Sequence, residues 1–398
     1  MRSVHGERRE AGVQSSLFGW PGVRVHRSPA DDTGVVPIGS VVSLFSGAGG
    51  LDLGVEAAGF STVAAVEWDE DAADTMEKNA ARFFPNLGGV VRADLYPLAA
   101  GSGQGATTRD ILRAGGLTLR NRPELLIGGP PCVAFSKSGF WLGWKRNGGD
   151  PAASLLQAYT RVLAEARPRY FILENVYALT FDNKASRPAF TRLLSEIEAA
   201  GYRFHWKVLN AADYGVPQAR PRLFIVGCRR GDKLPELPPP THHGSWERRR
   251  SGEGGGLPHM TSGEALHDLI TTPEPEEVVR GRWGHLLPKI PPGENYLYFT
   301  EVRGHPEPIF EWRSRYWSFL LKLDPNKPSP TIQAQPGPNV GPFHWDNRRL
   351  RVPELRRLFT FPDDFELVGR RASVQAQMGN SVPPLLAEQV ASGIAACM

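Results

Sequence analysis

The chain has 398 residues, of which 41% are hydrophobic and 22% charged, and its formal net charge is +4. This is ordinary globular composition, with room for one large or two modest domains. The small positive charge permits an anionic partner such as nucleic acid but does not require one. The sequence lacks any run of about 18 apolar residues, so we expect no membrane span.

The three cysteines are Cys132, Cys228 and Cys397, and they form no CxxC pair. An odd thiol and this spacing support neither a zinc site nor a disulfide scaffold, so we expect no metal and a reduced, cytoplasmic setting. Residues 1–38 have a basic start but no long apolar core after it, which argues against a signal peptide. Their Gly, Pro, Arg and Ser content predicts a loosely ordered N-terminal extension.

From about residue 39 predicted strands and helices alternate along the chain. We expect strands at 41–45, 61–67, 90–94, 123–129 and 170–176, with helices at 51–59, 70–82, 151–166 and 188–200. The stretch 99–123 is read as a loop with one or two helical turns. Two closing strands at 204–210 and 222–228 are expected to be antiparallel. This alternation predicts a doubly wound, mostly parallel α/β sheet with helices on both faces.

The composition changes near residue 232. The segment 232–346 is rich in Pro, Gly and Arg and predicts a second, smaller and irregular domain after a first domain over 39–231. The final segment, 347–398, is basic at first and ends in an apolar helix that opens at Pro383 and Pro384.

A glycine turn follows the first predicted strand. GAGG at 47–50 stands where an α/β sheet binds a nucleotide-like ligand, and Glu67 ends the next strand 20 residues after Gly47, as a ribose-binding acid does. Asp52 breaks the full GxGxxG pattern, so a nucleoside cofactor without phosphates fits better than a dinucleotide. Asp94, after the third strand, is a candidate partner for an exocyclic amine. The alternative interpretation is that these residues are only the turn glycines and strand-end acids that occur in any α/β fold.

The stretch GGPPCVAFS at 128–136 places Cys132 after two stiff prolines, which suits a nucleophile on a rigid loop beyond a strand. The alternative for an isolated cysteine is a buried structural role. Glu174, in ENV at the end of strand 170–176, favours the reactive interpretation. Parallel strand ends meet at one sheet edge, so a thiol, an acid and a nucleoside pocket would gather there. QARPR at 218–222 adds polar groups, although a solvated edge strand has the same pattern.

Together these segments resemble the DNA (cytosine-5)-methyltransferase family, in order, over roughly residues 40–230 and 347–395. The matching motifs are LFSGAGG, Glu67-Trp68, Asp94-Leu95, GGPPCVAFS, ENV, QARPR, RRLRVPELRRLFTFPDDF and QMGNSVP. Ser43 departs from the pattern, because many relatives carry Asp there. The resemblance implies transfer of a methyl group from S-adenosylmethionine to cytosine C5 in double-stranded DNA, with the target base flipped out.

The resemblance also implies residue roles. Cys132 would be the nucleophile, Glu174 the acid at cytosine N3, Arg222 a contact to O2, and Arg220 a support for the catalytic loop. The implied cofactor contacts are Phe45, Ser46, Gly47, Gly49, Gly50, Leu51, Glu67, Trp68, Asp94, Leu95, Pro131, Asn380, Ser381 and Val382. The candidate DNA contacts are Ser136, Gln218, Arg303, Arg313, Arg315, Gln333 and Gln335.

Residues 232–346 would then be the target-recognition domain, in which TIQAQ (331–335) resembles a segment near the flipped base. For WRSRYWSF (312–319), a Trp-rich core is as good an interpretation as base reading. The sequence resembles prokaryotic enzymes that mark DNA, either with a cognate restriction endonuclease or alone, and we expect a monomer. The rivals are an RNA cytosine-5 methyltransferase, a catalytically silent DNA-binding regulatory module and a hydride-transferring oxidoreductase.

Overall fold

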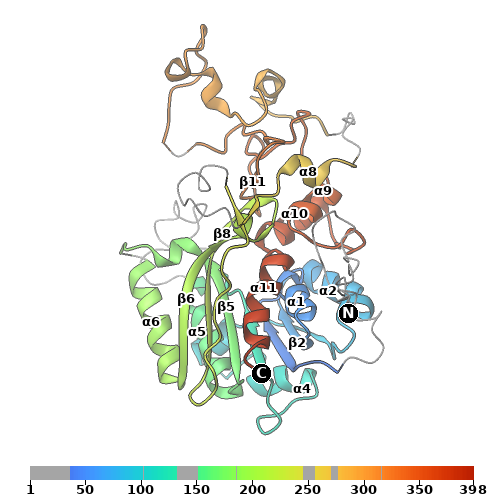
Figure 1. The fold of residues 1–398 in the computed structure, drawn as a ribbon, viewed down its shortest axis with the longest axis vertical. Coiled ribbons are helices and arrows are strands. Elements are labelled where there is room, and N and C mark those ends of the chain that lie inside the picture. The colour runs from blue at the N-terminus through green and yellow to red at the C-terminus, as the bar shows by residue number, and fades with distance from the viewer. Residues whose placement is uncertain are drawn as a thin grey trace, which may run out of the picture.

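The structure is a computed structural model that describes residues 36–101, 103–131, 151–184, 186–244, 256–269, 277–314 and 316–398. The expected N-terminal extension lies almost wholly outside the described residues. In Figure 1 the sheet and its helices form the lower part of the molecule, and the yellow to orange segments form the upper part. The C-terminal helix, in dark red, returns to the sheet layer beside the blue N-terminal elements.

A seven-stranded sheet organises the lower part, in the order β3-β2-β1-β4-β5-β8-β6. Its strands are β1 (Ser40–Leu44), β2 (Ser61–Glu67), β3 (Val90–Arg92), β4 (Leu125–Gly128), β5 (Tyr170–Val176), β6 (Tyr202–Asn210) and β8 (Pro221–Arg229). The first five are parallel, and β8 runs antiparallel between β5 and β6. The predicted doubly wound sheet with an antiparallel closing pair is therefore confirmed.

The helices lie close to their predicted places, with additions. They are α1 (Gly50–Ala57), α2 (Glu70–Phe83), α3 (Tyr96–Ala100), α4 (Thr108–Ala114), α5 (Pro151–Ala166), α6 (Ser186–Ala199), α8 (Ser262–Leu266), α9 (Val352–Leu358), α10 (Arg371–Asn380) and α11 (Pro384–Ala395). α4 lies in the stretch expected to be mainly loop. Thr107 and Asp110 cap its start reciprocally, which explains why so short a helix forms there.

The central strands are buried on both faces, and alternate residues enter different cores. In β5, Phe171 and Leu173 pack in a cluster that also holds Leu163 of α5. Tyr170 and Ile172 point to the opposite face and share a cluster with residues of α1 and α11. This period of two, with a helix layer on each side, is the reason the strands read as continuous apolar runs in the sequence.

The upper part has few regular elements. It holds β9 (His242–His243) paired with β10 (Leu257–Pro258), and the 3₁₀ helices η7 (Gly284–Lys289), η8 (Tyr296–Phe299) and η9 (Glu301–Arg303). A separate apolar cluster forms there around Leu287, Phe299 and Phe343. Leu266 and Ile332, however, pack in the same cluster as Leu53 of α1. The domain limits at residues 232 and 346 stay a prediction.

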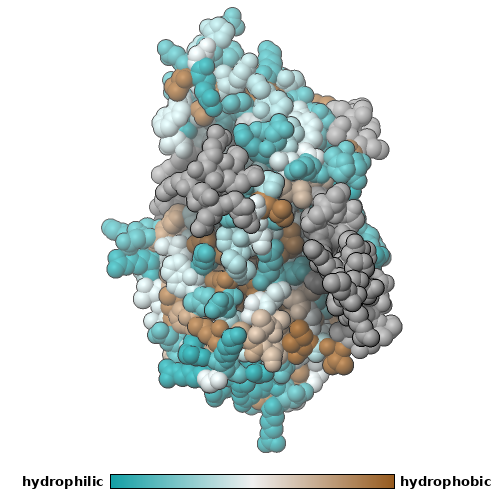
Figure 2. Space-filling view, in the orientation of Figure 1, coloured by the Kyte–Doolittle hydropathy of each residue, from teal (hydrophilic) through white to brown (hydrophobic). Residues whose placement is uncertain are grey.

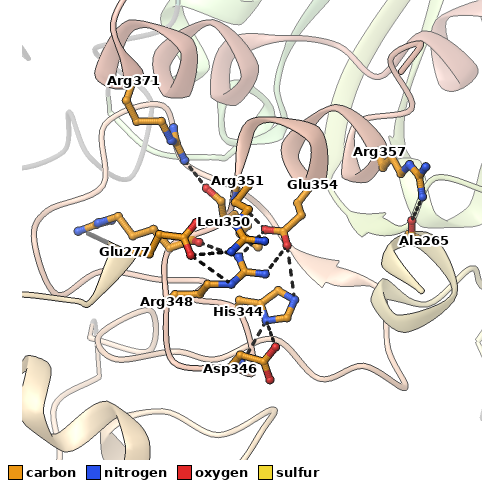
Figure 3. Close-up of polar contacts among 11 residues, drawn as sticks. Ala265, Glu277, His344, Asp346, Arg348, Leu350, Arg351, Glu354, Arg357 and Arg371 are labelled. Carbon is orange, nitrogen blue, oxygen red and sulfur yellow. Dashed lines mark hydrogen bonds and ion pairs between the residues drawn. The ribbon is translucent and has the colours of Figure 1, made fainter. Parts of the chain in front are cut away.

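Junctions at two places, among others in the described residues, tie the upper part to the sheet layer. The two-residue strand β11 (Ser329–Pro330) pairs in parallel with β7 (Gln218–Ala219) just before β8. Figure 3 shows the second junction, where Arg348 makes a bidentate ion pair with Glu354 of α9, at 2.9 and 2.6 Å. Glu277 pairs with Arg351 beside them, and His344 lies against Glu354.

Figure 2 shows that the upper part is mainly hydrophilic on this face, while apolar residues gather lower down, over the sheet layer. Among the described helices, none is long and apolar enough to cross a membrane.

Candidate active site

The carboxyl ends of the parallel strands and the start of β8 meet at one sheet edge. β2 ends at Glu67, and β5 carries Glu174 near its end. Because β8 is antiparallel, its first residues lie at the same edge, with Arg222 opposite Val176. The fold thus brings Glu67, Glu174 and Arg222 to the edge where α/β sheets bind ligands.

The turn after β1 has a backbone that few residues adopt. Phe45, Gly47 and Gly49 have φ values of 56°, 54° and 78°. Left-handed backbone is cheap for glycine but costs about 1–3 kcal/mol at Phe45, and such strain concentrates at functional sites. A Cβ added at Gly47 would meet no atom within 4 Å. The turn therefore presents open backbone at Gly47, and Ser46 behind it donates a 3.0 Å hydrogen bond to the Ser43 hydroxyl.

Glu67 orients this turn. Its Oε2 accepts a 2.7 Å hydrogen bond from the Gly47 amide, and its Oε1 accepts from the amides of Trp68 and Asp69, both at 2.9 Å. Burial raises the pKa of Glu67 above its ordinary value, although these hydrogen bonds oppose the shift. Oε2 accepts only one of these hydrogen bonds and keeps a second lone pair, so the carboxyl group can also accept from a ligand hydroxyl.

Three further expected cofactor contacts follow the ends of β2 and β3 in the sequence. Trp68 is 69% exposed, which leaves its indole ring free to cover a ligand. Asp94 is exposed, and its Oδ1 accepts a 2.8 Å hydrogen bond from the Tyr96 amide. Leu95 is buried and anchors the segment.

The last motif lies beside the first. A Cβ added at Gly50 would come closer than 3.0 Å to the Val382 carbonyl, so only glycine allows this approach. Leu51, the next residue of α1, is buried. Ser381 is buried, with its hydroxyl bonded to the Gln377 carbonyl, while Asn380 is exposed. These two segments, far apart in the sequence, thus lie side by side, because α11 packs against α1.

Glu174 is the buried acid of the edge. Its Oε1 lies 3.1 Å from Arg222 Nε, and both side chains are largely buried. Burial raises the pKa of Glu174, and the nearby Arg222 and Arg220 guanidinium groups lower the extent of that rise. A Cβ added at Gly129 would come within 3.0 Å of Glu174 Oε2. The acid therefore lies directly beside the segment that leads to Cys132.

Asn175 was not predicted as a site residue. Its side-chain amide donates a 3.0 Å hydrogen bond to the Pro130 carbonyl, which ties strand β5 to that same segment. Its place in ENV beside Glu174 was the available sequence signal. Pro131 is half-buried. Cys132 and Ser136 lie outside the described residues, so their expected roles remain predictions.

Gln218 and Arg220 point inward. Gln218 is fully buried, and its side-chain amide bonds to the Leu358 carbonyl and the Ile332 amide. Its expected DNA contact is therefore corrected, because both ends of its amide are used within the chain. Arg220 is 1% exposed, and its Nη2 donates to the carbonyls of Gly379 and Ser381, at 2.6 and 2.9 Å.

The other candidate DNA contacts lie in the upper part. Arg303 is exposed and pairs with Glu294 at 3.2 Å, and Arg313 lies over the Tyr316 ring. Gln333 is half-buried, Gln335 is exposed, and Arg315 lies outside the described residues. Trp312 and Trp317 are 57% and 40% exposed. The alternative of a Trp-rich core is therefore wrong for these two residues.

Asp52 is a buried acid behind the glycine turn. It lies in the first turn of α1, is fully buried, and neither of its side-chain oxygens has a hydrogen-bond partner. Burial raises its pKa to about 7. The negative charge of Asp52 itself is thus disfavoured at this buried position behind the turn. In the part of the chain that the structure describes, no group of His, Cys, Asp and Glu residues could hold a metal ion.

Comparisons with known proteins agree with this geometry. Residues 39–396 match the family model described as C-5 cytosine-specific DNA methylase. The chain is 44% identical to the type II methyltransferase M.SacI of Streptomyces achromogenes, over 88% of this chain and 91% of that protein. It is 32% identical to M1.HphI of Haemophilus parahaemolyticus, over 89% and 86%.

Solved structures show the same fold. The S. pombe Dnmt2 methyltransferase aligns with a TM-score of 0.56 at 15% identity, over 90% of this chain and 97% of that one. The Entamoeba histolytica methyltransferase EhMeth aligns with a TM-score of 0.56 at 14% identity, over 89% and 97%.

Proposed function

The chain belongs to the C-5 cytosine-specific DNA methylase family and is a DNA (cytosine-5)-methyltransferase, and we propose a division of labour among its residues. The rival readings as an RNA enzyme, a silent module or an oxidoreductase are set aside by this membership. The observation that carries the proposal is the buried Glu174–Arg222 pair, 3.1 Å apart, beside Gly129 and the segment leading to Cys132.

S-adenosylmethionine is the proposed cofactor. The open backbone at Gly47, the strand-end acids Glu67 and Asp94, and the exposed Trp68 ring fit a nucleoside with a short amino-acid tail. Phe45, Ser46, Gly49, Gly50, Leu51, Leu95, Pro131, Asn380, Ser381 and Val382 complete the proposed pocket. When bound, this cofactor supplies the electrophilic methyl group.

Cys132 is the proposed nucleophile. Cytosine C5 is a poor nucleophile until a thiolate adds to C6, which makes C5 enamine-like. Glu174, whose burial favours its protonated form, would supply the proton or hydrogen bond at N3, and Arg222 would contact O2 while fixing the Glu174 carboxyl group. Once C5 carries the methyl group, loss of the C5 proton to water and expulsion of the Cys132 thiolate from C6 would restore the aromatic ring, and the proton at N3 would return to Glu174.

The DNA substrate is proposed to be double-stranded, with the cytosine flipped out at a cost of a few kcal/mol of unstacking. Arg303, Arg313, Arg315, Gln333 and Gln335 are the proposed base readers, and Ser136 a proposed contact from the catalytic loop. The type II names of M.SacI and M1.HphI support a cytoplasmic enzyme that protects DNA from a cognate restriction endonuclease. We propose that it acts as a monomer.

The test is expression in a methylation-deficient bacterial host, followed by chemical conversion and sequencing of plasmid DNA. We expect 5-methylcytosine at one short repeated motif, which also reveals the recognition site. Cys132→Ser should bind cofactor and DNA yet leave the plasmid unmethylated. Cys397→Ser, which changes a half-buried thiol at the far end of the chain, is the matched control and should methylate normally. Full methylation by Cys132→Ser would overturn the nucleophile assignment.

A further inference from the structure

Residues 329–334, here called the reader strip, carry Gln333 and lie just before Gln335. One side of the reader strip is hydrogen-bonded to β7 and its neighbour Pro217. β11 pairs with β7, the Ser329 amide donates to the Pro217 carbonyl at 2.9 Å, and the Thr331 hydroxyl donates to the Ala219 carbonyl at 2.7 Å. The reader strip is thus held on the sheet layer at the entrance to β8, next to the strand that carries Arg222.

The other side of the reader strip lies against helix α10. Gln375 donates a 2.7 Å hydrogen bond from its side chain to the Gln333 carbonyl. A Cβ added at Gly379 would come closer than 3.0 Å to the backbone of Ala334. Helix backbone and strip backbone therefore touch directly, with no side chain between them to absorb a displacement.

Arg220 joins the two from within. Its Nη1 donates to the Ile332 carbonyl at 3.3 Å, while its Nη2 donates to the carbonyls of Gly379 and Ser381. The guanidinium group also lies over the Phe359 ring, 5.0 Å from its centroid. One fully buried cation thus bonds both the reader strip and the carboxyl end of α10, where helix carbonyls lack helical partners.

The far end of this contact chain is the cofactor turn. α10 ends at Asn380, and the Val382 carbonyl then presses against Gly50 at the start of α1. A path of direct contacts therefore runs from the reader strip through Arg220 and α10 to the cofactor turn. Each step is either backbone against backbone or a hydrogen bond to a buried guanidinium group.

We propose that α10 couples DNA reading to cofactor binding, with Arg220 as the positioning residue and Gly379 as the contact point. The inference rests on the proposed function of both ends. DNA that binds the reader strip stabilises its contacts with α10 and thereby the positions of Ser381 and Val382, so bound DNA tightens cofactor binding. By linkage, bound cofactor tightens DNA binding by the same factor.

The experiment measures the dissociation constant of S-adenosylhomocysteine by calorimetry, with and without a duplex oligonucleotide that contains the sequenced recognition site. The ratio of the two constants is the coupling factor. We expect about tenfold for the wild type, within the usual range for coupled sites. Gly379→Ala should reduce the ratio to below about threefold, because its methyl group displaces the reader strip from α10. Gln375→Ala should reduce it less, by removing one hydrogen bond.

Gly89→Ala is the matched control, since a Cβ there meets no atom within 4 Å and its ratio should equal that of the wild type. A wild-type ratio near one, or an unchanged ratio in a folded Gly379→Ala protein, would overturn the coupling. If Gly379→Ala does not fold, an unchanged ratio in Gln375→Ala overturns it instead. A wild type that binds no S-adenosylhomocysteine at all would contradict the proposed cofactor, a different failure from lost coupling.

Discussion

Two opposing influences act on the pKa of Glu174 at the sheet edge. Burial disfavours its charge, while Arg222 at 3.1 Å stabilises it, and the net result is a raised pKa. Such a group keeps its proton to a higher pH than an ordinary glutamic acid, which suits an acid that works near neutrality. Arg222 then has a second use, because it holds the carboxyl group in one orientation toward the Gly129 segment.

Glu174→Gln is expected to lower the single-turnover methylation rate about 10²–10⁴-fold, because the amide can donate a hydrogen bond but not a proton. The wild-type rate should fall as pH rises through the raised pKa of Glu174, since the acid form is then lost. Binding of S-adenosylhomocysteine should persist in the variant. Glu198→Gln, which changes an exposed carboxyl group on α6, is the control. A Glu174→Gln rate within threefold of the wild type would remove Glu174 from the chemistry.

At the scale of elements, the pattern of apolar residues predicted those helices and strands whose positions depend on burying apolar side chains. Strand 170–176 was expected and found with the same limits, because its residues enter two cores. α10 was not expected, because RASVQAQMGN has no apolar stripe at helical spacing. Its position depends on Arg220 and the reader strip. The Arg220 contacts join residues more than 100 positions apart, which no local pattern encodes.

The candidate site residues also divide into those that the sequence could place and those that it could not. Motif residues at strand ends, such as Glu67 and Glu174, could be placed at one edge from strand order alone. The inward role of Gln218 could not, because its alternation with Arg220 and Arg222 reads equally well as a solvated edge. Only the tertiary contacts of Gln218, to Ile332 and Leu358, distinguish the two.

Helix α1 carries two buried acids one turn apart, and they make stability depend on pH. Burial raises the pKa of Asp52 from 3.8 to about 7 and that of Glu56 from 4.5 to about 8. Their contribution to stability is complete below about pH 4, where both the folded and the unfolded chain are protonated, and is lost as pH rises through 7 and 8.

Asp52→Asn is therefore expected to flatten this dependence. Urea unfolding at pH 5.5 and pH 8 should show a smaller fall in the free energy of unfolding for the variant than for the wild type. The amide mimics the neutral acid and cannot ionise. Glu198→Gln serves again as the exposed control and should keep the wild-type difference. An equal fall in Asp52→Asn and wild type would show that Asp52 ionises as readily as an exposed aspartate.

At the scale of the whole molecule, the upper part is held by polar contacts as much as by its apolar cluster. The network in Figure 3 joins Glu277 and His344, which precede residue 346, to Arg348, Arg351 and Glu354. Arg348 and Glu354 are 0% and 1% exposed, so water does not solvate either charge if the pair is broken. Burial lowers the pKa of His344 to about 4, so the ring is neutral beside this pair at physiological pH.

Breaking this pair should cost more than removing it. Glu354→Gln removes the carboxylate charge that forms the bidentate pair with the buried Arg348 guanidinium group, and we expect it to lower the free energy of unfolding by about 3–5 kcal/mol. Replacing both partners, as Arg348→Met with Glu354→Leu, should recover most of that loss, because no charge then stays buried without compensation. Glu294→Gln, at the exposed pair with Arg303, should change stability by less than about 1 kcal/mol. Chemical unfolding of the four proteins decides the matter. A double variant no more stable than Glu354→Gln would mean that geometry, rather than charge compensation, makes the junction depend on this pair.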